Sequence, residues 1–134
     1  MIVAIAGQCY VGLSLTCLLS KGHTVYAVDV DSRKVEMINS GLSPIADPLI
    51  ERYLADADIH SGISATSDGP SAYAKADIVI IATPTNYDDV THQFDTTSIE
   101  SVIDEVAKTG AQPTVVIKST VPVGYTKQIS ERYP

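Results

Sequence analysis

Short apolar runs that alternate with helical patterns constrain the fold of this chain more than any other feature. Asp77–Ala82 and Thr114–Lys118 are rich in β-branched residues and look like strands buried on both faces. Such runs, separated by helices, are typical of a parallel sheet covered on both sides. The sequence therefore predicts an α/β fold with a doubly wound parallel sheet. The predicted strands cover residues 2–6, 24–29, 63–66, 78–82 and 114–118, and the predicted helices cover 11–21, 32–40, 48–54, 71–75, 99–108 and 125–132.

Composition excludes several classes of protein. The formal net charge is −7 and lysine and arginine form no runs, so we expect no nucleic-acid surface. No apolar stretch reaches the roughly 18 residues of a membrane span. No basic segment precedes the first apolar run, which argues against a signal peptide and for a cytoplasmic protein. Cys9 and Cys17 are too far apart for a disulfide if both lie on the first helix, and the scattered histidines predict no metal site.

The turn after the first strand, Gly7-Gln8-Cys9-Tyr10-Val11-Gly12, has the form of a dinucleotide-binding turn. Amides at the start of the following helix can hold a pyrophosphate. Asp29 ends the next strand, 22 residues after Gly7, close to the spacing of about 20 expected for a ribose-binding carboxylate. These features predict a Rossmann-like sheet that binds NAD. Arg33 and Lys34 leave NADP open, and a purely structural turn with a solvated Asp29 is the alternative to any cofactor site.

Cys9 stands where the dinucleotide turn ordinarily has its middle glycine. Because that position does not require a positive φ, we expect the turn to form but to bind its cofactor more weakly. A second hypothesis is that a thiol at a helix N-terminus is unusually acidic. An inert substituted glycine is the simpler interpretation.

Polar residues also follow the fourth and fifth predicted strands. Thr83-Pro84-Thr85 leaves one strand, and Ser119 and Thr120 leave the other. Carboxyl ends of parallel strands meet at one edge of the sheet, so these hydroxyls could bind a nicotinamide, a water or a substrate hydroxyl. Ser98 is expected to cap the helix that begins at about residue 99, and residues 83–97 are expected to form a long polar loop.

These residues and several longer motifs resemble the UDP-glucose 6-dehydrogenase family, which also includes GDP-mannose and UDP-N-acetylmannosamine dehydrogenases. The resemblance extends over nearly the whole chain. Its most specific motifs are S-T-V-P-V-G at 119–124 and N-x-G-x-x-P-I at 39–45, and A-T-P-T-N-Y-D-D at 82–89 is closest to the UDP-glucose branch.

The resemblance implies an enzyme that oxidises a sugar C6 hydroxyl to a carboxylate in two NAD-dependent steps. It implies that Gly7, Val11 and Gly12 contact the pyrophosphate, that Asp29 binds the adenosine ribose with Arg33 or Lys34 nearby, and that Thr83 and Thr120 line the nicotinamide side. Their positions make Cys9, Tyr10, Pro84, Thr85 and Ser119 further candidates for cofactor binding. Thr120 matches a family threonine that helps to position a catalytic water. The family's nucleophilic cysteine lies in a second, sugar-binding domain, and neither Cys9 nor Cys17 matches it.

We therefore expect residues 1–134 to form an NAD-binding domain truncated before its sixth strand, which binds a nucleotide sugar only together with the missing domain. A stand-alone, non-catalytic nucleotide-binding or regulatory module is the alternative. In the truncated domain, strand 114–118 would be an exposed sheet edge, and such edges pair with other chains. The sequence thus predicts a homo-oligomer or self-association through this edge.

Overall fold

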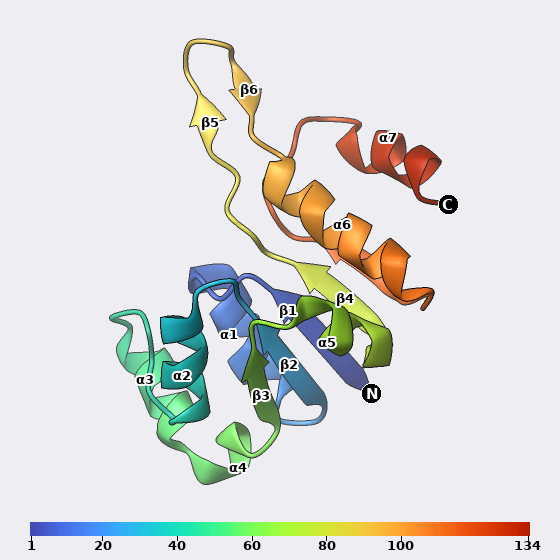
Figure 1. Ribbon diagram of the computed structural model, residues 1–134. Helices are drawn as coiled ribbons and strands as arrows, with labels where there is room; N and C mark the ends of the chain where they lie inside the picture. The colour runs from blue at the N-terminus through green and yellow to red at the C-terminus, as the bar shows by residue number, and fades with distance from the viewer.

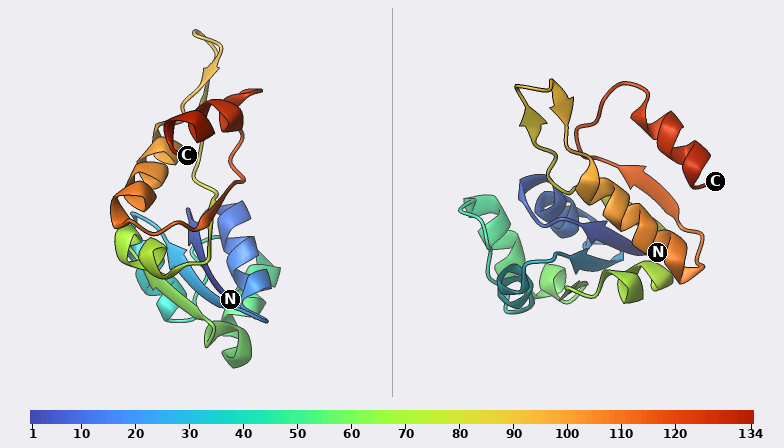
Figure 2. Two further views of the ribbon diagram at one scale, coloured as in Figure 1. Left: turned by 90° about the vertical axis from the view of Figure 1, so that its right-hand side faces the viewer. Right: turned by 45° about the horizontal axis from the view of Figure 1, so that its top comes forward.

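The computed structural model describes all 134 residues and has a central parallel sheet between two layers of helices (Figure 1, Figure 2). The strand order is β3-β2-β1-β4-β7, so the chain moves outward from β1 in one direction and then in the other. This confirms the predicted doubly wound sheet, with its topological switch between β1 and β4. The strands are β1 (Ile2–Ala6), β2 (Thr24–Val28), β3 (Ile63–Thr66), β4 (Ile78–Ile81) and β7 (Thr114–Ile117).

Alternating side chains of β1 enter two separate cores. Val3 and Ile5 pack with α1, whereas Ala4 and Ala6 join the core formed with α5, α6 and α7. The first four helices therefore cover one face of the sheet and the last three cover the other. The helices are α1 (Tyr10–Leu19), α2 (Ser32–Asn39), α3 (Pro48–Ala55), α4 (Ala57–His60), α5 (Gly69–Lys75), α6 (Thr97–Thr109) and α7 (Tyr125–Arg132).

Aspartates begin four consecutive helices. Asp31, Asp47, Asp56 and Asp68 each accept a hydrogen bond from a backbone amide in the first turn of α2, α3, α4 and α5 respectively. Such caps satisfy amides that have no partner within the helix. Asp31 is thus the N-cap of α2.

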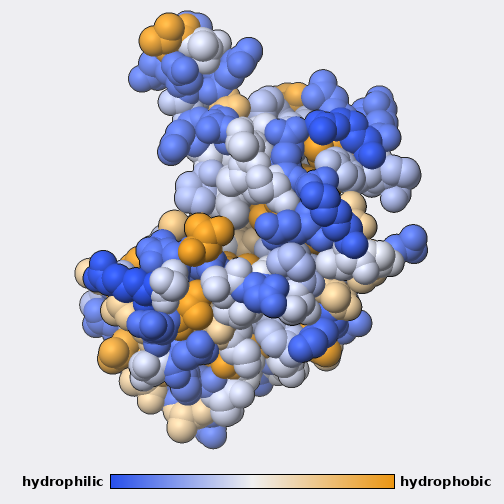
Figure 3. Space-filling view, in the orientation of Figure 1, coloured by the Kyte–Doolittle hydropathy of each residue, from blue (hydrophilic) through white to orange (hydrophobic).

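Three features of the structure differ from the sequence prediction. α4 was not expected. The segment expected to be a polar loop contains a hairpin of β5 (Tyr87–Asp88) and β6 (Gln93–Phe94). The ring centroids of Tyr87 and Phe94 lie 5.1 Å apart across this hairpin. The hairpin projects from the body of the molecule (Figure 1, Figure 3). The prediction that Ser98 caps α6 was wrong, because Thr96 is the N-cap residue and makes no side-chain hydrogen bond to the first turn.

The last strand, β7, is an exposed edge of the sheet, as expected, although its apolar sequence by itself is typical of a strand buried on both faces. It pairs only with β4, and Val115 and Val116 are 36% and 38% exposed. A largely apolar cavity of about 560 Å³ lies beside it, between α6 and α7. The sequence pattern identified the strand correctly, but burial depends on a neighbour that these residues do not supply. None of the helices combines the length and the apolar character needed to cross a membrane.

Candidate cofactor site

Two glycines let the β1–α1 turn pass close to the end of β4. Gly7 has a φ of 94° and donates its amide to Val28 O at 2.8 Å. A Cβ at Gly7 would lie 2.7 Å from Ala82 O, and a Cβ at Gly12 would overlap the carbonyl oxygen of Gly7. Neither position accommodates a side chain without movement of the backbone. The close approach at Gly12 is thus to the turn itself, with Ala82 Cβ as the next neighbour.

The start of α1 has free backbone donors. The amides of Tyr10, Val11 and Gly12 donate to no group of the protein, Cys9 makes no side-chain cap bond, and the first turn contains no acidic residue. The four helices that follow are all capped by aspartate. An uncapped helix start concentrates partial positive charge and suits an anion such as a diphosphate.

Cys9 adopts a conformation that any residue can take, with φ −82° and ψ −158°. The expectation that the turn tolerates this residue is confirmed. Lys34 reaches the turn from α2, where its Nζ donates to Cys9 Sγ at 3.4 Å. A positive charge therefore lies beside the free amides of α1. The acidic-thiol hypothesis stays a prediction.

The carboxylate of Asp29 is held in place by backbone amides. Its Oδ2 accepts from Gln8 N at 2.8 Å and its Oδ1 accepts from Asp31 N at 2.9 Å. Each oxygen retains a lone pair that can accept from another donor. This geometry fits the predicted interaction with ribose hydroxyls.

Sequence reasoning overlooked Gln8, which is completely buried. Its Nε2 donates to Ile5 O at 2.9 Å, and its Oε1 lies 3.0 Å from Thr16 Oγ1. These bonds fasten the turn to both β1 and α1. No signal in the sequence distinguishes a buried glutamine from an exposed one in a turn.

Hydrogen bonds join the segments that leave β4 and β7. Ser119 Oγ donates to Thr83 O at 2.6 Å, and Thr85 Oγ1 donates to Thr120 O at 2.7 Å. Ser98, at the start of α6, also contacts this region: its Oγ lies 2.9 Å from Pro84 O and 3.0 Å from Thr83 Oγ1. The two exit segments, β4 exit (83–86) and β7 exit (118–121), are thus linked in both directions.

A cavity of about 330 Å³ extends from the β1–α1 turn to α5 and α6. Its volume is within the range of small-molecule sites. Gly7, Asp29, Thr83, Pro84 and Glu105 are among its lining residues. The cavity lies at the carboxyl ends of β1, β2 and β4, where a doubly wound sheet binds its ligands.

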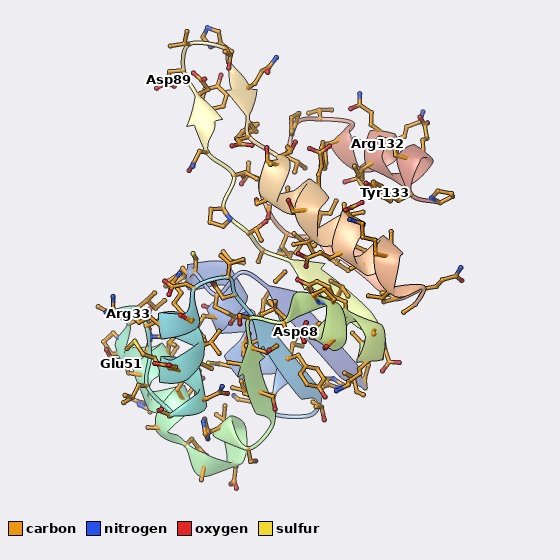
Figure 4. The ribbon with its side chains drawn as sticks, in the orientation of Figure 1. Arg33, Glu51, Asp68, Asp89, Arg132 and Tyr133 are labelled. Atoms are coloured by element: carbon orange, nitrogen blue, oxygen red, sulfur yellow. The ribbon has the colours of Figure 1, made fainter.

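The remaining predicted residues surround this cavity at different distances. Tyr10 and Val11 begin α1 and are 62% and 48% exposed, and Arg33 lies at the outer surface of α2 (Figure 4). Ser119 and Thr120 lie toward β7, beyond the cavity lining. The structure therefore separates an Asp29 half of the site from a β7 half, with the amides of α1 near the first.

Comparisons with known proteins agree with this geometry. Residues 1–133 match the family model described as UDP-glucose/GDP-mannose dehydrogenase family, NAD binding domain. The chain is 46% identical over 133 residues to a UDP-glucose 6-dehydrogenase of Streptococcus pneumoniae, covering 99% of this chain and 33% of the relative. It is 42% identical to a UDP-glucose 6-dehydrogenase of Campylobacter jejuni, with 99% and 34% covered.

A solved structure shows the same fold. A ternary complex of GDP-mannose dehydrogenase from Pseudomonas aeruginosa superposes with a TM-score of 0.88 and 33% identity, over 96% of this chain and 30% of that one. The chain spans about a third of the length of the curated relatives it matches. The matched family model, the parallel sheet and the glycine turn show that the chain belongs to the UDP-glucose/GDP-mannose dehydrogenase family, as an NAD-binding domain.

Proposed function

We propose that this chain is the NAD-binding portion of a UDP-glucose 6-dehydrogenase, which oxidises C6 of a nucleotide sugar to a carboxylate in two NAD-dependent steps. The observation that carries this proposal is the uncapped start of α1 beside the Asp29 carboxylate. The 42–46% identity to UDP-glucose 6-dehydrogenases supports that branch of the family. NAD, when bound, accepts the hydride from the sugar.

The residues present fit such a cofactor. The free amides of Tyr10, Val11 and Gly12 would hold the diphosphate, with Lys34 adding a positive charge. Asp29 would bind the adenosine ribose and repel the 2′-phosphate of NADP.

The β4 and β7 exits would form the nicotinamide side of the site. Thr83, Pro84 and Thr85 are proposed on one exit, and Ser119 and Thr120 on the other. Thr120 is proposed to position a water. Because the Ser119 and Thr85 hydroxyls already donate to backbone carbonyls, they can offer lone pairs but no free proton to a ligand.

A second domain, which binds the sugar, would supply the nucleotide-sugar site and the nucleophile. This chain alone would therefore bind NAD without oxidising a sugar. We also propose that the chain self-associates through β7, because Val115 and Val116 leave an apolar edge unpaired. A cytoplasmic location is proposed on the two free thiols, Cys9 and Cys17.

Calorimetry on the 134-residue chain and on Cys9→Gly tests the cofactor assignment. We expect both proteins to bind NAD and to prefer it to NADP. The variant should bind NAD more tightly, because a glycine lets the diphosphate approach the backbone more closely. Equal NAD affinity of the two proteins would remove the steric argument about Cys9. Absence of NAD binding by both would favour a stand-alone module without a cofactor.

A further inference from the structure

We infer that, in the cavity beside Asp29, the carboxylate of Glu105 is the specificity-determining group that recognises the 6-amino group of the cofactor's purine base. This inference rests on the proposed NAD-binding function and adds which residue recognises the base. It follows from the residues that line the cavity and from the placement of hydrogens on them.

Apolar side chains line part of the cavity next to the ribose-binding carboxylate. Val30 directly follows Asp29 and is 96% exposed, and Pro84 and Val102 also line the cavity. A base attached to a ribose on Asp29 would thus enter between apolar side chains. Glu105 comes from α6 at the α5 side of the same space.

Three hydroxyl groups of the lining already donate their hydrogens to other atoms of the protein. Ser98 has one hydroxyl hydrogen, and Pro84 O, a pure acceptor at 2.9 Å, takes it. The 3.0 Å contact between Ser98 Oγ and Thr83 Oγ1 must then use the hydrogen of Thr83. Ser101 Oγ donates to Thr97 O at 3.0 Å. These three side chains therefore present only lone pairs to a ligand, and Ser67, which makes no hydrogen bond of its own, can adapt to either role.

Glu105 is half-buried and makes neither a hydrogen bond nor an ion pair within the protein. Its Oε2 lies so close to Gly69 that a Cβ there would be 2.8 Å away. Burial and the nearby Glu105 charge raise the pKa of Tyr73, so that phenol stays protonated. Tyr73 is only 1% exposed, however, and offers a ligand almost no surface. Apart from Ser67, the accessible polar side chains of the lining are thus acceptors, two of them carboxylates.

An ionised carboxylate accepts hydrogen bonds and cannot donate them. The 6-amino group of adenine supplies the donor that Glu105 lacks. A 6-oxo group would place oxygen lone pairs against the carboxylate, and the N1–H of such a base lies at a different position on its edge, so Glu105 would lose the partner that the 6-amino group provides. Sites built around such a polar partner reject analogues without the matching group more strongly than apolar pockets reject a change in size.

The test is calorimetry on the full chain with NAD and with nicotinamide hypoxanthine dinucleotide, in which oxygen replaces the 6-amino group. We expect the chain to bind NAD about tenfold more tightly. Glu105→Gln presents an N–H as well as an oxygen, so it should bind the hypoxanthine dinucleotide more tightly and narrow the preference to about threefold or less. Glu131→Gln removes the same charge from the exposed surface of α7 and should leave the ratio unchanged.

The outcomes separate the two proposals. Equal binding of the two dinucleotides by the unmodified chain would overturn the inference while leaving NAD binding intact. A tenfold preference that persists in Glu105→Gln would also overturn it, because another group would then read the base. Failure of the unmodified chain to bind NAD would overturn the proposed function and the inference with it.

Discussion

Replacement of Gly7 by alanine tests whether the β1–α1 turn depends on both backbone conformation and close packing. Gly7 has a φ of 94°, and an added Cβ would lie 2.7 Å from Ala82 O and 2.9 Å from Thr83 Cα. A left-handed conformation costs a non-glycine residue about 1–2 kcal/mol. Crowding against well-packed backbone adds about 1–3 kcal/mol. Gly7→Ala should therefore lower the free energy of unfolding by about 2–5 kcal/mol.

Two other glycines separate these contributions. Gly110 has a φ of 77° but open space where an added methyl group would lie, so Gly110→Ala should cost only the conformational part, about 1–2 kcal/mol. Gly22 has neither a positive φ nor a neighbour within 4 Å of an added Cβ. Gly22→Ala should be neutral or stabilise by up to about 1 kcal/mol, because alanine restricts the unfolded chain.

Urea denaturation of the three variants measures this series, provided that the slope of unfolding free energy against denaturant stays constant. For a domain of this size, 2–5 kcal/mol corresponds to a fall in Tm of roughly 7–17 °C. The order Gly22, Gly110, Gly7 of increasing cost is the essential result. A Gly7→Ala protein no less stable than Gly110→Ala would refute the packing argument.

Four further predictions follow from other parts of the structure. Burial raises the pKa of Cys17 to about 11 from an unfolded value near 9, so the unfolded state loses this proton first and the free energy of unfolding should fall as pH rises from about 9 to 11. Cys17→Ala should flatten that decline, and alkylation of the folded chain should modify Cys9 alone. Asp29→Asn should weaken NAD binding by about tenfold and reduce the preference over NADP, measured by calorimetry; an unchanged ratio would contradict the role of the charge. Tyr125→Phe removes a buried hydroxyl that has no partner and should raise the free energy of unfolding by up to about 1 kcal/mol in urea denaturation. Val116→Lys should abolish self-association in sedimentation experiments at high concentration, and a monomeric unmodified chain would count against the β7 edge as an interface.

The strands were predictable because their signal is local. Each β-branched run between turn residues became a strand within one residue of the expected bounds. The Gly7–Asp29 relation was equally accessible, since it depends on spacing along the chain. The family resemblance carried the prediction further, to the NAD-binding domain that the matched family model supports.

Features that depend on tertiary contacts could not be predicted in this way. Ser98 looked like a helix cap, but its hydroxyl contacts Thr83 and Pro84 instead. The two-residue strands of the β5–β6 hairpin are too short to show an alternating pattern. Glu105 occupies an ordinary position on an amphipathic helix, and only the packing of α5 against α6 brings it to the cavity.

The paired bonds between the β4 and β7 exits have a consequence for motion. Because Ser119 is tied to the carbonyl of Thr83 and Thr85 to that of Thr120, neither segment can shift alone without breaking a bond. The two would move as one unit, hinged on strands that are themselves neighbours. A ligand bound at either exit segment would then also restrict the motion of the other segment.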